Sequence, residues 1–376
     1  MKRQPHLLHI LPGFGTGGIQ TVLCRVLNGL GRRYRHSVLA LNGDLSASKR
    51  LDPALDVNLL PVDAPPQGRS ARRQFIRSHS PDLVLTSNWG SYDWVIAQAF
   101  APIAPHIHQE HGFGPDEARG EIARRVWARR LTLPFIHRLV VPSITLEEKA
   151  KAAWWLPRAR IRRIANGVDA GDILRGDMDP QDRDLFPAER TIFATVAPLR
   201  AEKRIDRLIR AFASLPSATD EPSKSGTMLL IIGDGPERAS LEELARQSGR
   251  GADIRFAGFR PEPVRLLAHA DVYAISSDTE QLPASVLEAM ALGLPVVGTA
   301  VGDVPVMIAE ENRPYTVDRD DEAGLARAMG ELARNGGLRE TLGEANRRRQ
   351  KADFDADAMV DAYRRLFDEA LGEIGK

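Results

Sequence analysis

Short apolar runs alternate with longer amphipathic segments along most of the chain. Each run is rich in leucine, isoleucine or valine, and in the segments between them apolar positions recur every three or four residues. This alternation is typical of parallel strands joined by helices that cover both faces of a sheet, so we predict an α/β protein. The predicted strands are Leu7–Leu11, Ser37–Leu41, Leu83–Thr86, Leu139–Val141, Ile192–Ala197, Met228–Ile232, Ile254–Phe256 and Val272–Ile275.

A change in this pattern divides the strands into two groups. Asn166-Gly167 is typical of a turn, and the stretch that follows, as far as Arg190, is polar and has no apolar period. With 376 residues the chain is also too long for one ordinary core. We therefore predict a Rossmann-like domain over 1–167, a second one over 168–355, and a helix over 356–376 that packs across the domains. Open α/β sheets bind ligands beyond the carboxyl ends of their strands. With two such domains in tandem, we expect the ligand site in a cleft between them.

Composition narrows the class of protein. Hydrophobic residues make up 43% of the chain and charged residues 27%, as in a folded soluble protein. Cys24 is the only cysteine, which excludes an intrachain disulfide and favours a reducing compartment. No stretch approaches the roughly 18 apolar residues that cross a bilayer. We expect a cytoplasmic protein whose membrane contact, if any, is peripheral and on the inner face.

Charge is distributed unevenly along the chain. Residues 1–170 hold 24 Lys and Arg against 13 Asp and Glu, whereas the remainder holds 27 against 37. A basic half of this kind suits an anionic partner, for which nucleic acid, acidic glycan and anionic lipid are candidates. Complementary charge between the two domains explains the asymmetry equally well.

The 119–131 segment of the first domain combines cations with apolar side chains. Ile122, Val126, Trp127 and Leu131 are interleaved with five arginines. The pattern favours either a surface helix packed by its apolar stripe or a helix that rests on an anionic membrane. The arginines are Arg119, Arg124, Arg125, Arg129 and Arg130.

A glycine-rich loop follows the first predicted strand. Gly13, Gly15 and Gly18 have the spacing of a dinucleotide-binding fingerprint, in which glycines let the backbone approach a phosphate at a helix N-terminus. Asp44, which closes a later strand, lies 26 residues beyond Gly18, further than is usual for the ribose-binding acid. An NAD(P)-binding oxidoreductase is therefore an alternative at this point.

Cations follow the first strand of the second domain. Arg200, Lys203 and Arg204 lie between Ile192–Ala197 and a segment with helical apolar spacing. A basic run is most often a group of solvated charges, but cations at a helix N-terminus are electrostatically disfavoured unless an anion binds there. Two cations at the carboxyl end of a strand also suit a diphosphate.

Two glutamates flank the start of a further helix in this domain. Glu280 lies in the loop after a strand, the helix begins near Pro283 and ends at Gly293, and Glu288 lies in its second turn. The neighbours of Glu288 are almost all apolar, which favours a paired or functional carboxylate over a solvated one. Carboxylates bind sugar hydroxyls well, so we expect the two to contact different parts of a long ligand.

Together these motifs resemble the family-4 glycosyltransferases, retaining enzymes with the GT-B fold of two Rossmann-like domains facing a cleft. The resemblance is most specific in the second domain and covers most of the chain. The matching segments are Arg200–Lys203, Gly233–Pro236, Phe256–Phe259, the pair Glu280 and Glu288, and, in the first domain, Gly17–Gln20, Glu110–Gly112 and Asn166–Asp169.

The resemblance implies a role for each site residue. Arg200 and Lys203 would neutralise the diphosphate leaving group, Glu288 would hold the ribose, and Glu280 would hold hydroxyls of the donor sugar. His111 would lie against that sugar, although the sequence fits a core or hinge histidine nearly as well. The other donor-binding residues would be Gly17, Gly18, Leu282, Pro283, Gly233, Phe259 and Arg260.

The resemblance also implies a nucleotide diphosphate sugar as donor, a glycan or lipid-linked acceptor in cell-surface polysaccharide biosynthesis, no metal or other cofactor, and no nucleic acid. Gln281 and Pro198 depart from the family, which usually has glycine at both positions. Both changes reduce backbone freedom close to the donor and bear on sugar preference. A GT-B nucleotide-sugar epimerase and a donor-binding pseudoenzyme are further alternatives.

Overall fold

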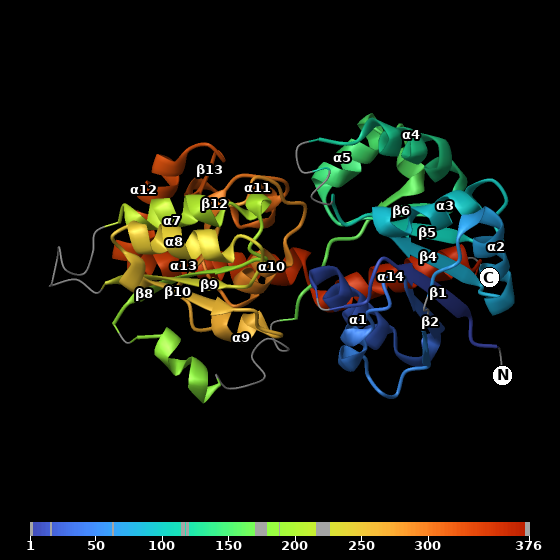
Figure 1. The fold of residues 1–376 in the computed structure, drawn as a ribbon, viewed down its shortest axis with the longest axis horizontal. Coiled ribbons are helices and arrows are strands. Elements are labelled where there is room, and N and C mark those ends of the chain that lie inside the picture. Colours follow the sequence, from blue (N-terminus) through green and yellow to red (C-terminus); the bar gives the residue numbers. More distant parts are fainter. Residues whose placement is uncertain are drawn as a thin grey trace. The chain divides into compact units, whose positions relative to one another are not determined.

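The chain divides into two compact units in a computed structural model (Figure 1). Unit 1 comprises residues 1–167 and 356–376, and unit 2 comprises residues 168–355. The residues that the structure describes are 3–15, 17–61, 64–113, 117, 120–169, 179–187, 189–215 and 226–372.

The described part of unit 1 contains a seven-stranded parallel sheet of order β3-β2-β1-β4-β5-β6-β7. The order reverses between β1 and β4, and ligands of open α/β sheets bind at such a switch point. The strands are β1 His6–Leu11, β2 Arg35–Ala40, β3 Val57–Leu60, β4 Leu83–Ser87, β5 His106–Gln109, β6 Arg138–Val141 and β7 Ile161–Arg163.

Helices cover both faces of this sheet (Figure 1). Leu7 packs with residues of α1 and α14 on one face, whereas Leu8 packs with Ile76 of α2 and Trp94 of α3 on the other. This follows from the strand period of two, which sends successive side chains to opposite faces. The helices of unit 1 are α1 Gly18–Leu30, α2 Gly68–His79, α3 Tyr92–Ala99, α4 Ala123–Thr132, α5 Ile144–Ala152 and α14 Ala356–Ala370.

The last helix, α14, is an integral part of unit 1 rather than a separate third segment. Its apolar stripe, which includes Met359, Tyr363 and Leu366, is buried in the same core as α1. Asp368 accepts a hydrogen bond from the Tyr34 hydroxyl at 2.5 Å. The core of unit 1 is therefore completed by residues that follow all of unit 2 in the sequence.

The described part of unit 2 contains a six-stranded parallel sheet of order β10-β9-β8-β11-β12-β13, with its switch point between β8 and β11. Its strands are β8 Thr191–Val196, β9 Thr227–Ile232, β10 Ile254–Gly258, β11 Val272–Ile275, β12 Val296–Thr299 and β13 Thr316–Val317. Its helices are α7 Ile205–Ala213, α8 Arg238–Gln247, α9 Pro263–Leu267, α10 Ala284–Ala291, α11 Val304–Met307, α12 Glu322–Arg334 and α13 Gly336–Asp353.

Each of the eight predicted runs overlaps a strand, so the α/β prediction is confirmed. The apolar segment after Pro295, which the sequence also predicts as a strand, is β12, whereas β3, β5, β13 and the edge strand β7 were missed. These segments are short or rich in polar residues, and they lack the apolar run on which the prediction depended. None of the described helices is both long and apolar enough to cross a membrane.

Buried histidines pair with one another inside the sheet of unit 1. His9 Nε2 lies 3.0 Å from His36 Nδ1, and Thr86 Oγ1 lies 2.8 Å from a ring nitrogen of both His106 and His108. Burial lowers the pKa of His36 to about 4 and that of His106 to about 3. Both of these rings are therefore neutral at pH 7.

We expect unit 1 to lose stability as the pH falls from 7 to 5. The unfolded chain protonates its histidines near pH 6.5, whereas the fully buried His36 stays neutral down to about pH 4, so acid favours the unfolded state. This one ring lowers the free energy of unfolding by about 2 kcal/mol at pH 5. Urea unfolding followed by tryptophan fluorescence measures the effect in unit 1 alone, because all five tryptophans lie within residues 1–167. Equal free energies of unfolding at the two pH values would contradict it.

Candidate functional site

In unit 2, the loops that follow β8 and β11 are tied together at the switch point. The short helix η8 (Ala201–Lys203) comes after β8, and Ser276 comes directly after β11. The Asp278 N–H donates to the Glu202 carbonyl at 2.9 Å, and the Ser276 hydroxyl donates to the Lys203 carbonyl at 3.0 Å. The predicted cationic element and the loop carrying the first glutamate are therefore brought together.

Lys203 and Glu280 form the centre of this arrangement. Lys203 Nζ lies 2.6 Å from Glu280 Oε1, and the Ser277 hydroxyl donates to the same oxygen at 2.6 Å. The two charged side chains are 20% and 10% exposed, so solvent screens them less than a surface pair. Because a carboxylate has about four acceptor positions, Glu280 keeps capacity for a ligand beyond these two contacts. Ser277 was missed from the sequence, where it is one of two adjacent serines.

The neighbouring arginines have different surroundings. Arg204 has a left-handed backbone conformation, with φ 48°, and it pairs with Asp206 at 3.0 Å and with Asp278 at 3.3 Å. The Arg200 side chain is exposed and accessible to an anion. Arg204 therefore holds the loops together, whereas Arg200 is the cation open to a ligand.

The helix α10 carries the second predicted glutamate. Glu288 lies in its second turn, Pro283 is its N-cap residue and Leu282 is buried. Burial raises the pKa of Tyr273 on β11, and the charges of Glu280 and Glu288 raise it further. The negative charges of both carboxylates therefore oppose ionisation of the same buried Tyr273 hydroxyl.

Two glycines allow backbone segments to meet closely here. A Cβ on Gly302 would lie 2.0 Å from the carbonyl oxygen of Glu280, and φ at Gly302 is +55°. A Cβ on Gly233 would lie 1.9 Å from the carbonyl oxygen of Ala197. Neither position accommodates a side chain without movement of the backbone. Gly302, which the sequence interpretation missed, supports the Glu280 loop, and Gly233 packs the loop after β9 against the loop after β8.

Phe259 and Arg260 follow β10, the strand on the other side of β9 from β8. Phe259 is exposed, whereas Arg260 pairs with Asp182 at 2.8 Å. The Gly233 N–H donates to the Gly258 carbonyl at 3.0 Å, which joins this loop to the one after β9.

In unit 1, the predicted glycine loop connects β1 to α1. Gly17 is the N-cap residue of α1 and Gly18 is its first residue. Asp44 lies beyond the end of β2, where it accepts a hydrogen bond from the N–H of Ser46 at 2.9 Å. A Cβ on Gly15 would lie 2.1 Å from the Asp44 carboxylate. Asp44 therefore orders a turn against the glycine loop.

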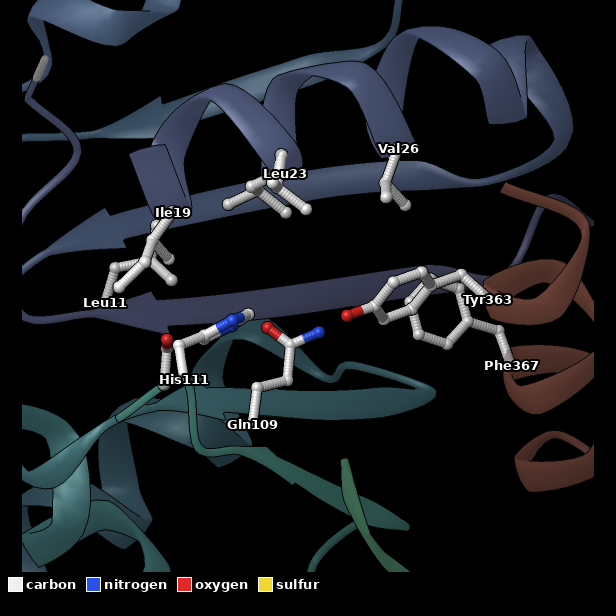
Figure 2. A pocket seen from close by; sticks show the side chains of 10 residues that line it. Leu11, Ile19, Leu23, Val26, Gln109, His111, Tyr363 and Phe367 are labelled. Carbon is white, nitrogen blue, oxygen red and sulfur yellow. The ribbon is translucent and has the colours of Figure 1, made fainter. Parts of the chain in front are cut away.

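A pocket lies at the carboxyl ends of the central strands of unit 1 (Figure 2). Its polar lining comes from Ser87, Gln109, His111 and the hydroxyl of Tyr363. The Gln109 amide and the Tyr363 hydroxyl point toward each other in Figure 2. The remaining lining residues are apolar and are Leu11, Ile19, Val22, Leu23, Val26 and Phe367.

His111 is positioned by Asn88. The His111 N–H donates to Asn88 Oδ1 at 2.8 Å, and the Asn88 N–H donates to the Gln109 carbonyl at 2.8 Å. Asn88 has φ 56° and ψ 176°, close to a backbone region that residues other than glycine rarely adopt. Burial lowers the pKa of His111 to about 4, against the opposing charge of Glu110. The ring is thus neutral at pH 7 and suited to hydrogen bonding. Asn88 was missed from the sequence, where the only signal is a polar residue directly after a strand.

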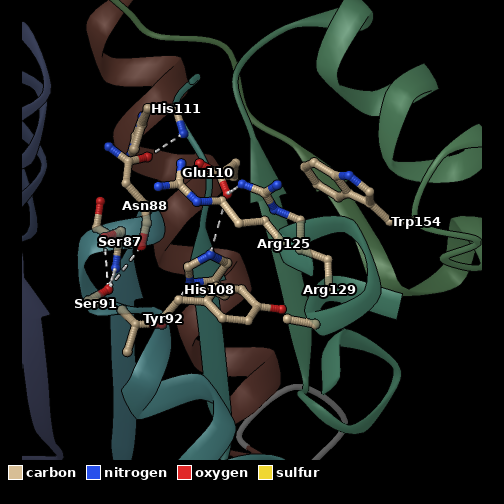
Figure 3. A network of polar contacts seen from close by, with 12 residues as sticks. Ser87, Asn88, Ser91, Tyr92, His108, Glu110, His111, Arg125, Arg129 and Trp154 are labelled. Atoms are coloured by element: carbon tan, nitrogen blue, oxygen red, sulfur yellow. Dashed lines mark hydrogen bonds and ion pairs between the residues drawn. The ribbon is translucent and has the colours of Figure 1, made fainter. Parts of the chain in front are cut away.

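Buried charges lie beneath the segment that carries His111 (Figure 3). Arg129 is 1% exposed, and its guanidinium lies 3.2 Å from Glu110, 3.4 Å from Glu117 and 3.5 Å from Glu121. Arg125 pairs with Glu117 at 3.0 Å. Buried charges are tolerated when they are paired, and here three carboxylates converge on two guanidinium groups.

This network corrects the expected orientation of the 119–131 segment. One of the two alternatives from the sequence was a surface helix packed by its apolar stripe, but α4 buries Arg125 and Arg129 and exposes Trp127 and Leu131. The buried arginines pair with glutamates that precede the helix in sequence. The opposite face of the helix, which carries Trp127 and Leu131, therefore faces solvent. Arg119 lies outside the described residues.

Within the part of the chain that the structure describes, no group of three or more His, Cys, Asp and Glu side chains is arranged to hold a metal ion. His106 and His108 instead share Thr86 as a hydrogen-bonding partner. The independence of the reaction from metal stays a prediction.

Two parallel α/β sheets, each with candidate ligand-binding loops at its switch point, are the architecture of GT-B glycosyltransferases. Residues 179–349 match the protein-family model described as "Glycosyl transferases group 1", and residues 16–172 match the one described as "Glycosyltransferase Family 4". The chain belongs to the family-4 glycosyltransferases of the GT-B fold. This membership overturns the oxidoreductase considered from the glycine spacing.

Curated relatives carry transferase and synthase names. Lipopolysaccharide core biosynthesis glycosyltransferase LpsE of Rhizobium meliloti is 30% identical over 59% of this chain and 61% of LpsE. N-acetyl-alpha-D-glucosaminyl L-malate synthase of Bacillus anthracis is 26% identical over 57% of this chain and 55% of the synthase. The chain thus matches less than two thirds of the length of either relative. D-inositol 3-phosphate glycosyltransferase of Salinispora arenicola is 26% identical over 78% of this chain and 70% of that enzyme.

Solved structures share the fold along almost the whole chain. Sucrose-phosphate synthase from Thermosynechococcus elongatus has a TM-score of 0.79 and 20% identity, over 98% of this chain and 100% of that chain. HepE of Anabaena, solved in complex with UDP, has a TM-score of 0.77 and 18% identity, over 97% of this chain and 100% of that chain. The predicted GT-B fold is therefore confirmed.

Proposed function

We propose that the protein transfers a sugar from a nucleotide diphosphate sugar to a hydroxyl group of a glycan or lipid-linked acceptor in cell-surface polysaccharide biosynthesis. We propose further that the anomeric configuration is retained and that no metal ion takes part. The observation that carries this proposal is the contact of Lys203 with Glu280 at the switch point of unit 2. A cation suits the diphosphate of such a donor, and a carboxylate suits its sugar. The name of LpsE, a lipopolysaccharide core glycosyltransferase, supports the class of acceptor.

In this proposal, unit 2 binds most of the donor. Arg200 and Lys203 stabilise the negative charge that develops on the departing diphosphate, the role that a metal ion plays in other phosphate sites. Glu280 accepts hydrogen bonds from hydroxyls of the sugar, and Glu288 accepts them from the ribose. The other proposed contributors to the donor site are Leu282, Pro283, Gly233, Phe259 and Arg260, with Gly233 acting through the shape of its loop.

In unit 1, we propose that His111 hydrogen bonds to the donor sugar and that the backbone N–H groups of Gly17 and Gly18 bind phosphate oxygen at the start of α1. His111 acts as a neutral ring, because burial lowers its pKa to about 4. The bond between the anomeric carbon and the phosphate oxygen breaks, the acceptor oxygen bonds to that carbon on the same face, and the departing phosphate oxygen takes the acceptor proton. The reaction therefore needs no general base from the protein.

Gln281 and Pro198 lie beside the residues that bind the donor in this proposal. The Gln281 carbonyl accepts a hydrogen bond from the N–H of Asp303 at 3.1 Å, and the Pro198 carbonyl accepts one from the N–H of Arg200 at 2.9 Å. Both residues thus help to shape the donor loops. We propose that they influence sugar preference and leave the charge chemistry intact.

A donor screen tests this function. The melting temperature is measured with UDP, GDP, ADP and CMP sugars, and UDP sugars come first because HepE was solved with UDP. A ligand at a hundred times its Kd stabilises the folded state by about 2.7 kcal/mol, which is readily detected. We expect one nucleotide to raise the melting temperature and its sugar to be transferred with retention, as shown by NMR of the product, in the presence of EDTA.

Three results would contradict parts of the proposal. An altered sugar formed without an acceptor would identify an epimerase, and binding without any turnover would identify a pseudoenzyme. Loss of transfer in EDTA that is restored by a divalent cation would contradict metal independence while leaving the class of reaction intact.

A further inference from the structure

Unit 1 exposes a group of large apolar side chains on and beside α3 and α4. We call this group the aromatic surface. Single exposed apolar residues are common on soluble proteins, whereas a contiguous group marks an interaction site. Its members and their exposed fractions are Phe100 55%, Trp127 52%, Leu131 59%, Phe135 54% and Trp155 61%.

The members of the aromatic surface contact one another in pairs. The ring centroids of Trp127 and Trp155 lie 5.9 Å apart, and those of Phe100 and Phe135 lie 4.9 Å apart. Trp127, Leu131 and Phe135 follow at intervals of four residues along α4 and the adjoining η5 (Leu133–Phe135). Residues four apart on an α-helix share one face, so Leu131 lies beside Trp127. Phe135 on η5 and Phe100 at the end of α3 lie on elements that pack against α4.

The charge next to this surface is positive. The stretch from Ile122 to Leu146 contains no aspartate or glutamate. Of its five arginines, Arg125 and Arg129 belong to the buried network and Arg138 pairs with Glu369. The two that lie beside the surface are Arg124 and Arg130. The Arg130 guanidinium lies 4.9 Å from the ring centroid of Trp127 and 3.6 Å from that of Trp155, and Arg124 is exposed. Arginines and tryptophans therefore face solvent together.

The buried network described above explains why these rings face outward. Arg125 and Arg129 occupy the inner face of α4, where a tryptophan and a leucine would ordinarily be buried. Full burial of such a side chain stabilises the folded state by about 1.5–3 kcal/mol. Trp127 and Leu131 lose much of this stabilisation because they are exposed. This orientation is explained if a second surface covers the rings.

We propose that the aromatic surface docks unit 1 onto an anionic lipid bilayer. Tryptophan and phenylalanine rings insert at the boundary between headgroups and acyl chains, and arginines bind lipid phosphates while their stems lie along apolar surface. A second copy of this chain fits less well, because a two-fold interface through this surface would bring the arginines of both copies together. The docking goes beyond the proposed transfer reaction and does not depend on it.

Vesicle flotation tests the docking. The full chain is mixed with phosphatidylcholine vesicles, with or without one third phosphatidylglycerol, and the bound fraction is measured. We expect binding to the anionic vesicles, a blue shift of tryptophan emission on binding, and a decrease in binding of at least about tenfold for the variant Trp127→Ser/Trp155→Ser. Arg124→Gln/Arg130→Gln should weaken binding to anionic vesicles and reduce its dependence on salt.

Val306→Ser is the matched control, because it removes an exposed apolar side chain, 42% exposed, from α11 of unit 2. It should bind vesicles as the unaltered chain does. Unchanged melting temperatures show that the variants are folded. Failure of the unaltered chain to float with anionic vesicles, or equal binding by the double tryptophan variant, would overturn the proposal. A concentration-dependent dimer without vesicle binding that the double tryptophan variant abolishes, seen by sedimentation velocity, would assign the surface to a second copy and overturn it as well.

Discussion

Glu280→Gln is expected to lower kcat/KM for sugar transfer by about two to three orders of magnitude, the usual effect of removing one preorganised polar group from a transition-state site. The amide keeps the size of the side chain but removes the charge that pairs with Lys203 at 2.6 Å. Lys203 is then left without its carboxylate, and the donor sugar loses a strong acceptor. Initial rates over a range of donor concentrations measure the change.

The same variant separates a role in the reaction from a role in the fold. Its affinity for the free nucleoside diphosphate should change little, because Arg200 and Lys203 remain. Glu322→Gln is the matched control, since it removes a carboxylate of unit 2 whose ion pair with Arg210, at 3.0 Å, is on the surface and of small energetic value. If Glu280→Gln transferred sugar as fast as the unaltered protein, the proposed role of Glu280 would be wrong.

Arg129→Met should lower the free energy of unfolding of unit 1 by about 3–5 kcal/mol, the usual effect of removing one partner from a buried ion pair. Methionine fills much of the space of the arginine stem, so the loss of stability is due mainly to the missing charge. It leaves Glu110 and its neighbouring glutamates buried with less positive charge beside them. Urea unfolding measured by circular dichroism and by tryptophan fluorescence gives the change.

Arg130→Met is the matched control in the adjacent position. Arg130 lies over Trp127 and Trp155 on the outer face of α4, and a cation–π contact at such a site contributes about 0.5–1 kcal/mol. The two substitutions remove the same charge from neighbouring residues and differ chiefly in burial. Equal losses of stability would show that the buried network does not stabilise unit 1.

The strands that the sequence predicted correctly are those with continuous apolar runs. β5 was missed because three of its four residues are polar, and inside the sheet two of them, His106 and His108, hydrogen bond to Thr86 of β4. These partners come from different strands, so no local sequence pattern predicts their contact. The same holds for α4, whose inner face depends on Glu110 and Glu117, which lie outside the helix.

The candidate site was predicted best where its residues adjoin in sequence and follow a strand. The loops carrying Lys203 and Glu280 could both be identified because proline and charged residues follow the end of each strand. The contact between these loops depends on the order of strands in the sheet, and so does the support that Gly302 gives to the Glu280 loop. The strand order could not be predicted from the local sequence patterns. The roles of individual site residues in binding the donor stay predictions.

The place of α14 in the core of unit 1 has a consequence for synthesis on the ribosome. The strands of unit 1 emerge first, but the face of α1 that includes Gly29, against which Val360 packs, stays uncovered until all of unit 2 has been translated. Domains generally fold as units, and all the residues of unit 2 are present as soon as Asp355 has left the exit tunnel. Unit 2, although second along the chain, is therefore the first of the two that can complete its fold, and a nascent chain released before Ala356 would carry an unfinished unit 1.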